Sequence, residues 1–379
     1  MTSNRKEPVL VVLQLSGAYD ALNTFIPYSD PHYKDYRQTL KVEPEEVLAV
    51  NNNVGFHPSM APVKDLYDQG KVAVIQGIGY PNPIRSHFRS MDIWHTAAPD
   101  KMGMDGWLGR AIRDLDPNKE NVLTGVNFGR GLPRALASSG VSVASVGGLD
   151  SLGVLTGIEN QDQRTEALDI FARMYSPLIG SGPANDYLSQ TGLDALKGAD
   201  ILSTAPGKYD STVEYGGNQF AQWLKNVAQV HLAGFGSRVL YTGLNPGAFD
   251  THANQTTAFP KLWSEVTTAV GDFYQDLKEH DASEEVVILM FTEFGRRVLE
   301  NGSGTDHGSG SVAFVIGDQV EGGLYGEYPS LEPSKLDQGD LQWNTDFRST
   351  YSTLLEQWMG LDSKPILRDS YEQFDFIKQ

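Results

Sequence analysis

The stretch VLVVLQL, residues 9–15, decides the fold class. It is a continuous apolar run rich in β-branched side chains, which is typical of a strand buried on both faces of a parallel sheet. Three later runs share this character: KVAVIQGIG at 71–79, VVILMF at 286–291 and SVAFVIG at 311–317. Apolar residues with helical spacing lie between the runs, in residues 60–69 and again from Phe259 to Leu277. This alternation of helices with buried strands predicts an α/β fold.

The chain is predicted to form one domain. Residues 1–8 are a short polar tail that we expect to be disordered, and residues 9–379 form a single α/β domain. Within that domain, residues 161–237 have helical spacing in three segments and few strand signals, which predicts a helical insertion packed on the sheet. No linker in this region is long enough to isolate an independent domain. Residues 239–241 add a strand and residues 346–359 a last helix.

Composition excludes several classes of function. The 379 residues include 30 Lys and Arg against 48 Asp and Glu, which gives a formal net charge of −18. Such an acidic chain repels phosphate backbones and anionic lipids, so we expect no nucleic-acid partner and no membrane partner. Cysteine is absent, which excludes cysteine nucleophiles, iron–sulfur clusters and thiolate-bound zinc.

The N-terminal apolar run is too short for a signal peptide with its cleavage site or for a membrane span. As written, the chain is therefore expected to be cytoplasmic. Export is the alternative, if a leader has been removed from a longer precursor.

Polar residues follow the predicted strands. In open α/β sheets, active sites lie outside the carboxyl ends of the strands, so we expect these residues to meet at one edge. In chain order the candidates are Asp20 after the first strand, Arg85, Ser86 and His87 after the second, Asp250 and His252 after residues 239–241, and Glu293, Arg296, Asp306 and His307 after residues 286–291.

Two Asp and His pairs among these candidates, at positions 250/252 and 306/307, suit a divalent metal. Carboxylate and imidazole ligands fit Zn, Mn, Fe, Mg or Ca, and the pattern is compatible with one ion or with two. Arg296 or Arg85 would hold phosphate or sulfate oxygens by paired hydrogen bonds.

Most candidates also suit an ordinary structural role. Asp20 fits a helix N-cap or a turn, and the two Asp/His pairs fit a capped turn and a solvated glycine-rich loop. Ser86 is as compatible with a structural hydrogen bond as with nucleophilic attack. Glu293 is different, because a buried carboxylate without a partner is costly, so it needs Arg296, Arg297 or a metal. The histidines to which we assign core, surface or helix-end roles are His57, His95, His231 and His280.

Seven strings of the sequence carry a resemblance to a known family: LSGAYDALNTFIPY, YPNPIRSHF, DGWLGR, FDTHANQ, FTEFGRRVLENGSGTDHG, GGLYGEYPSL and TDFRSTYSTLLEQWMG. From about Val9 to Leu361 the chain resembles the family called domain of unknown function 1501. That family is similar to the alkaline phosphatase and sulfatase superfamily. The resemblance implies a mixed, mostly parallel sheet sandwiched by helices, with one or two divalent metals at its edge and a Ser, Thr or modified Cys nucleophile.

The resemblance also implies roles for individual residues. In chain order, Asp20 would be the first metal ligand, Ser86 the nucleophile, Asp250 and His252 the middle metal pair, Glu293 the late acidic ligand and His307, beside Asp306, the last His ligand. In the superfamily the late acid is an Asp followed directly by His, whereas Glu293 is followed by Phe294. A second metal would therefore be missing, or be completed by His87 or Asp306.

Together these features predict a metal-dependent hydrolase that cleaves small anionic phosphate or sulfate esters. The metal would lower the pKa of Ser86 or of a bound water, either of which would attack the ester, with His87 as general acid. Two alternatives remain open: a non-catalytic binding or scaffold protein that keeps the fold, and a metal-dependent phosphotransferase or isomerase.

Overall fold

The structure, a computed structural model, describes residues 7–149 and 197–379, together with residues 163, 166, 167 and 170. In this part of the chain a nine-stranded sheet has the order β11-β5-β10-β9-β1-β8-β6-β7, with β12 paired to β5. Its strands are β1 Val9–Gln14, β5 Val72–Gly79, β6 Gly125–Phe128, β7 Ala144–Val146, β8 Val239–Gly243, β9 Val286–Phe291, β10 Ser311–Ile316, β11 Gly323–Tyr325 and β12 Thr345–Asp346. A small separate sheet contains β2 Phe25–Ile26, β3 Leu48–Ala49 and β4 Gly55–Phe56.

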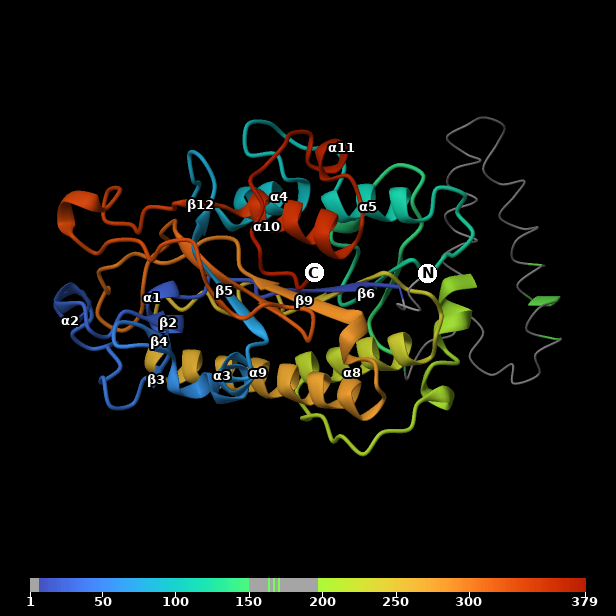
Figure 1. The fold of residues 1–379 in the computed structure, drawn as a ribbon, viewed down its shortest axis with the longest axis horizontal. Coiled ribbons are helices and arrows are strands. Elements are labelled where there is room, and N and C mark those ends of the chain that lie inside the picture. The colour runs from blue at the N-terminus through green and yellow to red at the C-terminus, as the bar shows by residue number, and fades with distance from the viewer. Residues whose placement is uncertain (1–6, 150–162, 164–165, 168–169, 171–196) are drawn as a thin grey trace.

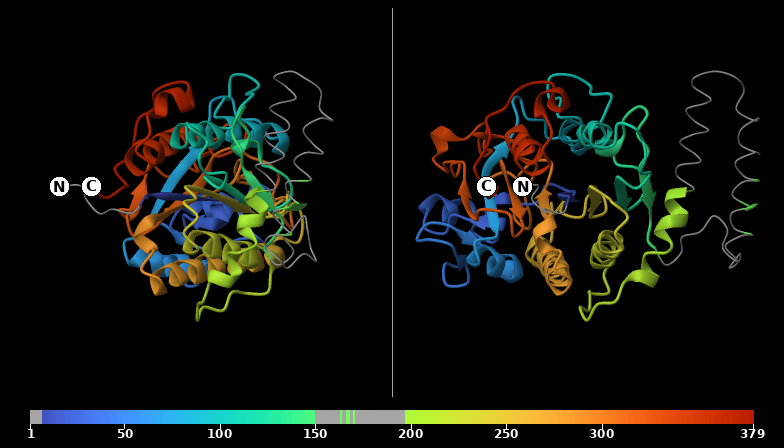
Figure 2. Two further views of the ribbon diagram at one scale, coloured as in Figure 1. Left: turned by 90° about the vertical axis from the view of Figure 1, so that its right-hand side faces the viewer. Right: turned by 45° about the vertical axis from the view of Figure 1, so that its right-hand side comes forward.

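Helices cover both faces of the large sheet (Figure 1). One layer contains α3 Ala61–Asp68, α8 Gln219–Leu232 and α9 Gln255–Glu279, and the other contains α4 His87–Thr96, α5 Trp107–Leu115, α10 Phe347–Thr353 and α11 Ser363–Leu367. Figure 2 shows the two layers from the side, with the sheet between them. Two short helices, α1 Ala21–Thr24 and α2 Pro31–Tyr36, lie near the small sheet.

Strand β1 confirms the prediction of a strand buried on both faces. It pairs in parallel with β8 on one side and β9 on the other. Val9, Val11 and Leu13 belong to the hydrophobic core under α3, α8 and α9, whereas Leu10 and Val12 belong to the core under α4, α5 and α10. Each fully buried aliphatic side chain of this kind contributes roughly 1.5–3 kcal/mol, so a short apolar strand can hold two helix layers together.

The direction of β10 determines which residues lie at the edge formed by the carboxyl ends of the parallel strands. This strand pairs antiparallel with both β5 and β9, whereas β9, β1, β8, β6 and β7 are parallel to one another. The carboxyl ends of β5, β9, β1, β8 and β6 therefore share one edge, here called the carboxyl edge, with the amino end of β10. The sheet is mixed and mostly parallel, as expected.

Several predicted elements agree with the structure and others differ from it. Helix α8 coincides with the third of the predicted helical segments, whereas most of residues 161–196 and residues 1–6 of the predicted tail lie outside the described residues. The single helix expected over residues 346–359 is instead α10 followed by a π-helical turn, Leu354–Trp358. In the described ranges, no helix combines the length and apolar character needed to cross a membrane.

Candidate metal centre

Four segments deliver histidines and acids to the carboxyl edge. His87 is the first residue of α4, which follows β5, and Glu293 follows β9. Asp250 and His252 lie between β8 and α9, and His307 lies in the loop before β10. An isolated bridge between Arg296 and His307 closes that last loop. Because β10 runs antiparallel to its neighbours, residues that precede it reach the same edge as residues that follow the other strands.

Three imidazoles and one carboxylate converge there, and we call His87, Asp250, His252 and His307 the candidate centre. The His307 Nε2 atom lies 3.0 Å from Nε2 of His87 and 2.9 Å from Nε2 of His252. Asp250 Oδ1 lies 3.4 Å from the Nε2 atom of His87, 3.0 Å from that of His252 and 3.1 Å from that of His307. Among the described residues, His87, Asp250 and His307 form a group whose ligand atoms all lie within 4.8 Å of one another.

The other nitrogen of each imidazole is held by a hydrogen-bond acceptor. His87 Nδ1 donates to Glu293 Oε1 at 2.7 Å, His252 Nδ1 to Asp306 Oδ1 at 3.1 Å, and His307 Nδ1 to the Arg85 carbonyl oxygen at 2.9 Å. A carbonyl oxygen or an ionised carboxylate accepts only, so each Nδ1 carries the proton. The three Nε2 atoms therefore face one another and a carboxylate oxygen. Nitrogen and carboxylate oxygen donors that face one another suit a cation at their meeting point, and such outer partners are typical of metal-ligating histidines.

Arg296 keeps Asp250 ionised. Its Nη2 donates to Asp250 Oδ1 at 2.5 Å. Burial by itself raises the pKa of Asp250, but the hydrogen bond and charge of Arg296 outweigh it and lower that pKa to about 2. The other Arg296 donors reach the carbonyl oxygens of Ala18, Gly17 and Thr305. The arginine predicted to hold substrate oxygens is thus only 1% exposed and engaged by the protein itself.

Glu293 is 2% exposed, and its partners are other than those the sequence suggested. Its Oε1 accepts from Gly17 N at 3.0 Å and from His87 Nδ1, and its Oε2 accepts from Thr292 Oγ1 at 2.8 Å. Burial raises the pKa of this carboxyl, but the hydrogen bonds, that of His87 foremost, lower it below its ordinary value. The bond to Glu293 in turn raises the pKa of His87. Glu293 therefore orients a histidine instead of pairing with Arg296 or Arg297.

His252 and Asp306 form the exposed side of the centre. Their side chains are 44% and 55% exposed. Asp306 also accepts from Asn301 Nδ2, and this bond and that of His252 lower its pKa. The loop that carries Asp306 lies against the protein, because a Cβ added at Gly304 would be only 2.3 Å from the Thr251 carbonyl oxygen. The loop packs directly on the segment that bears His252.

Asp20 lies outside the candidate centre. Its two oxygens accept from the Arg37 guanidinium at 2.5 and 2.9 Å, and Oδ2 also accepts from Gln255 Nε2 at 2.6 Å. Both side chains of the ion pair are 0% exposed. Asp20 occupies the N-cap position of α1 but makes no side-chain capping bond. The structure therefore places it in a buried ion pair, and sequence reasoning missed Arg37 because no motif or periodicity marks it.

Arg85 and Ser86 border the centre in different ways. The Arg85 guanidinium binds Asp340 Oδ2, and the Arg85 carbonyl oxygen accepts from His307 Nδ1. Asp340, which is 2% exposed, is a second residue that no sequence signal indicated. Ser86 is the exposed N-cap residue of α4 and makes no side-chain capping bond. It directly precedes His87 in the chain.

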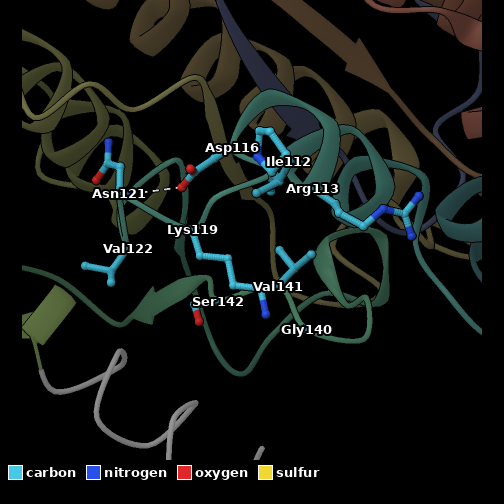
Figure 3. A pocket seen from close by; sticks show the side chains of 10 residues that line it. Ile112, Arg113, Asp116, Lys119, Asn121, Val122, Gly140, Val141 and Ser142 are labelled. Carbon is cyan, nitrogen blue, oxygen red and sulfur yellow. Dashed lines mark hydrogen bonds between the residues drawn. The ribbon is translucent and has the colours of Figure 1, made fainter.

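A separate hollow beside α5 differs from this centre (Figure 3). It encloses about 30 Å³ between α5 and the segment that leads to β6, where Asn121 bonds to Asp116. That volume corresponds to roughly one water molecule. No histidine is among the described residues that line it, and its charged lining residues are Arg113, Asp116 and Lys119.

Comparison with known proteins gives a family and distant structural likenesses. The chain has no match among curated proteins. Among solved structures, it resembles a sulfatase from Pseudoalteromonas sp., with 10% identity, 98% of this chain and 71% of that chain covered, and a TM-score of 0.45. It also resembles a protein in the alkaline phosphatase superfamily from Vibrio parahaemolyticus, with 10% identity, coverage of 96% and 69%, and a TM-score of 0.41.

A third likeness is to a phosphonate monoester hydrolase from Silicibacter pomeroyi, with 9% identity, coverage of 97% and 78%, and a TM-score of 0.40. These likenesses are too distant to transfer any residue's role. The family model described as "Protein of unknown function (DUF1501)" matches residues 7–368, nearly the whole chain. The chain therefore belongs to the DUF1501 family.

Proposed function

We propose that this protein is a metal-dependent hydrolase of phosphate or sulfate esters. The observation that carries the proposal is the convergence of three Nε2 atoms on Asp250 Oδ1, with each Nδ1 tied to an acceptor. Nitrogen and oxygen donors of this kind suit Zn, Mn or Fe. The acidic composition and the absence of cysteine agree with a site built from imidazole and carboxylate.

His87, Asp250 and His307 are the proposed ligands of one divalent ion. Three protein ligands with an open position are typical of catalytic metal sites. When bound, the ion supplies positive charge that polarises the ester and neutralises its oxygens. Glu293 and the Arg85 carbonyl oxygen fix the ring orientations, and Arg296 keeps Asp250 charged. We do not include Asp20 among the ligands, because Arg37 and Gln255 occupy its oxygens.

Ser86 is the proposed nucleophile. It is exposed, and it lies at the amino end of α4, where the first backbone N–H groups of a helix have no intrahelical partner and favour anions. In the proposed reaction Ser86 Oγ passes its proton to His252 Nε2 and bonds to phosphorus or sulfur while the bond to the leaving alcohol oxygen breaks. Water then cleaves the ester formed on Ser86, which regenerates the serine and releases phosphate or sulfate.

His252, with Asp306 behind it, is the proposed general acid. The pair lies on the solvent side of the centre, and Asp306 stabilises the protonated imidazole. In that form Nε2 donates a proton to the departing alcohol oxygen. This role differs from the sequence-based expectation that His87 is the acid, because the His87 side chain is 26% exposed against 44% for His252 and is held by the buried Glu293.

Metal content and hydrolysis of a broad ester panel, measured on the same variants, test the proposal. Protein purified without chelator is expected to retain one divalent ion per chain by mass spectrometry and to cleave at least one phosphate or sulfate ester. His307→Ala should lose both metal and activity, whereas His252→Ala should keep the metal and lose activity. His32→Ala is the matched control, because His32 lies on α2 and bonds only to Asp30. Absence of metal, with no change in melting on addition of Zn²⁺ or Mn²⁺, would refute the metal centre.

A further inference from the structure

A large pocket lies at the carboxyl edge beside the candidate centre. It encloses about 550 Å³, which is within the usual range of roughly 300–1,000 Å³ for small-molecule sites. The ends of three neighbouring parallel strands form its floor, through Gln14 of β1, Tyr241 of β8 and Asn127 of β6. The segment after β8 supplies Asp250 and His252 to the candidate centre and Leu244, Asn245 and Pro246 to this pocket, so the two sites share that segment.

The floor of this pocket is a connected set of neutral polar side chains. Gln14 Oε1 accepts hydrogen bonds from His95 Nε2 at 2.7 Å and from the Tyr241 hydroxyl, and Gln14 Nε2 donates to Ser16 Oγ at 2.7 Å. Burial lowers the pKa of His95 to about 4, so its ring is uncharged at neutral pH. His95 thus forms part of the pocket floor through its bond to Gln14, a role that the sequence did not indicate.

Asn127 adds a hydrogen-bonding group on the next strand. Its Nδ2 donates to the Gly131 carbonyl oxygen at 2.9 Å and to Ser145 Oγ at 2.7 Å. Among the described residues no donor is bonded to its Oδ1 atom, so that oxygen is available to a ligand. The amide and hydroxyl groups of this pocket offer both donors and acceptors, which matches the hydroxyl groups of a polyol.

Charge distinguishes this pocket from the rest of the molecule. The chain carries 48 acidic residues, yet none of the described residues that line the pocket is acidic, and the one cationic lining residue, Arg130, is exposed. A charged ligand would find no buried counter-charge on the floor. An uncharged ligand with several hydroxyl groups fits the donors and acceptors without that cost.

We propose that this pocket binds an uncharged sugar or similar polyol, which is the alcohol part of the ester cleaved at the candidate centre. The second half of this statement rests on the proposed function, because it assumes that an ester is cleaved there. The first half, polyol binding, stands on the pocket alone. Two loops connect the pocket to the centre. Ser16 lines the pocket while the adjacent Gly17 bonds to Glu293, and Asn245 lines it two residues after the end of β8, in the segment that continues to Asp250.

Saturation-transfer NMR on the intact protein tests the binding half with four probes: methyl α-glucoside, methyl α-galactoside, maltose and cellobiose. At least one is expected to bind. Asn127→Leu and Tyr241→Phe should each weaken that binding about tenfold, the effect of one lost hydrogen bond in a buried site. Asn118→Leu, a surface change outside the pocket, should leave it unchanged, and the melting temperature of each variant identifies any that fails to fold.

A kinetic comparison tests the link to the centre. If the sugar is the alcohol part, Asn127→Leu should raise KM for a sugar phosphate or sulfate about tenfold while leaving hydrolysis of the 4-nitrophenyl ester unchanged. Sugar binding without turnover of any ester would support the pocket and refute the proposed function. Ester turnover without sugar binding, or with binding that neither variant weakens, would refute the pocket and leave the hydrolase standing. Preferential binding of uridine or adenosine would also overturn the polyol assignment.

Discussion

At the scale of single residues, the candidate centre depends on which imidazole nitrogen carries the proton. The Arg85 carbonyl oxygen cannot donate, so it fixes the tautomer of His307 without a titratable partner. Glu293 does the same for His87 from a buried position. The residue types and their places after strands predicted that these groups would meet. The partners of Asp20 and Arg85 were not predictable: Arg37 and Asp340 lie in segments that no pattern marks, and nothing in the sequence linked Gln255 to Asp20.

The role of Ser86 gives the prediction at this scale. Ser86→Ala should lower kcat for ester hydrolysis by roughly 10³-fold or more, because the nucleophilic oxygen is lost, while metal content stays the same. Steady-state kinetics with metal analysis of the same sample measure both. Ser370→Ala, at an exposed serine near the carboxyl terminus, is the control. Activity that survives Ser86→Ala would assign the attack to water.

At the scale of elements, the turn after β1 and the antiparallel strand β10 determine which residues meet at the carboxyl edge of the sheet. The four long apolar strands were predictable because each is a run of buried aliphatic residues. The short strands β7, β11 and β12 were not, since two or three residues leave no periodicity. The antiparallel direction of β10 was also beyond pattern reading, because a buried strand has the same apolar composition in either direction.

The prediction at this scale concerns Gly17, which lies in the turn after β1. Its φ is +111°, and a Cβ there would lie 2.5 Å from the backbone nitrogen of Phe249, next to Asp250. Gly17→Ala should therefore destabilise the protein by roughly 2–4 kcal/mol and weaken metal binding, because strain and a backbone clash add together. Urea unfolding and metal titration measure the two effects.

Gly70→Ala is the matched control for that experiment. Gly70 has a φ of +72° but nothing within 4 Å of its added Cβ. It should cost only about 1 kcal/mol, the strain of the left-handed conformation, and should leave metal binding intact. Equal losses of stability in the two variants would show that the close approach to Phe249 is unimportant.

At the scale of the whole molecule, two buried histidines link stability to pH. Burial lowers the pKa values of His57 and His95 to about 4 each. In the unfolded chain an imidazole titrates near 6.5. Between these values the unfolded state binds protons that the folded state does not, so stability falls as pH falls from about 6.5 toward 4.

Each of these histidines should remove about 2 kcal/mol of unfolding free energy between pH 7 and pH 5. Urea unfolding at both pH values measures the loss. In the His57→Asn variant the loss of unfolding free energy between pH 7 and pH 5 should be about 2 kcal/mol smaller. Asparagine can still accept the Ser59 N–H hydrogen bond but does not titrate. An unchanged pH dependence in this variant would show that His57 is not the source.

The proposed ligands also differ widely in chain position. His87 and His307 are 220 residues apart, and Asp250 is 57 residues from His307. An ion held by all three would act as a cross-link that closes a very long loop, so no short fragment of the chain could retain it. Its presence would therefore gauge how much of a preparation is native, because only a chain whose distant segments are joined can keep it.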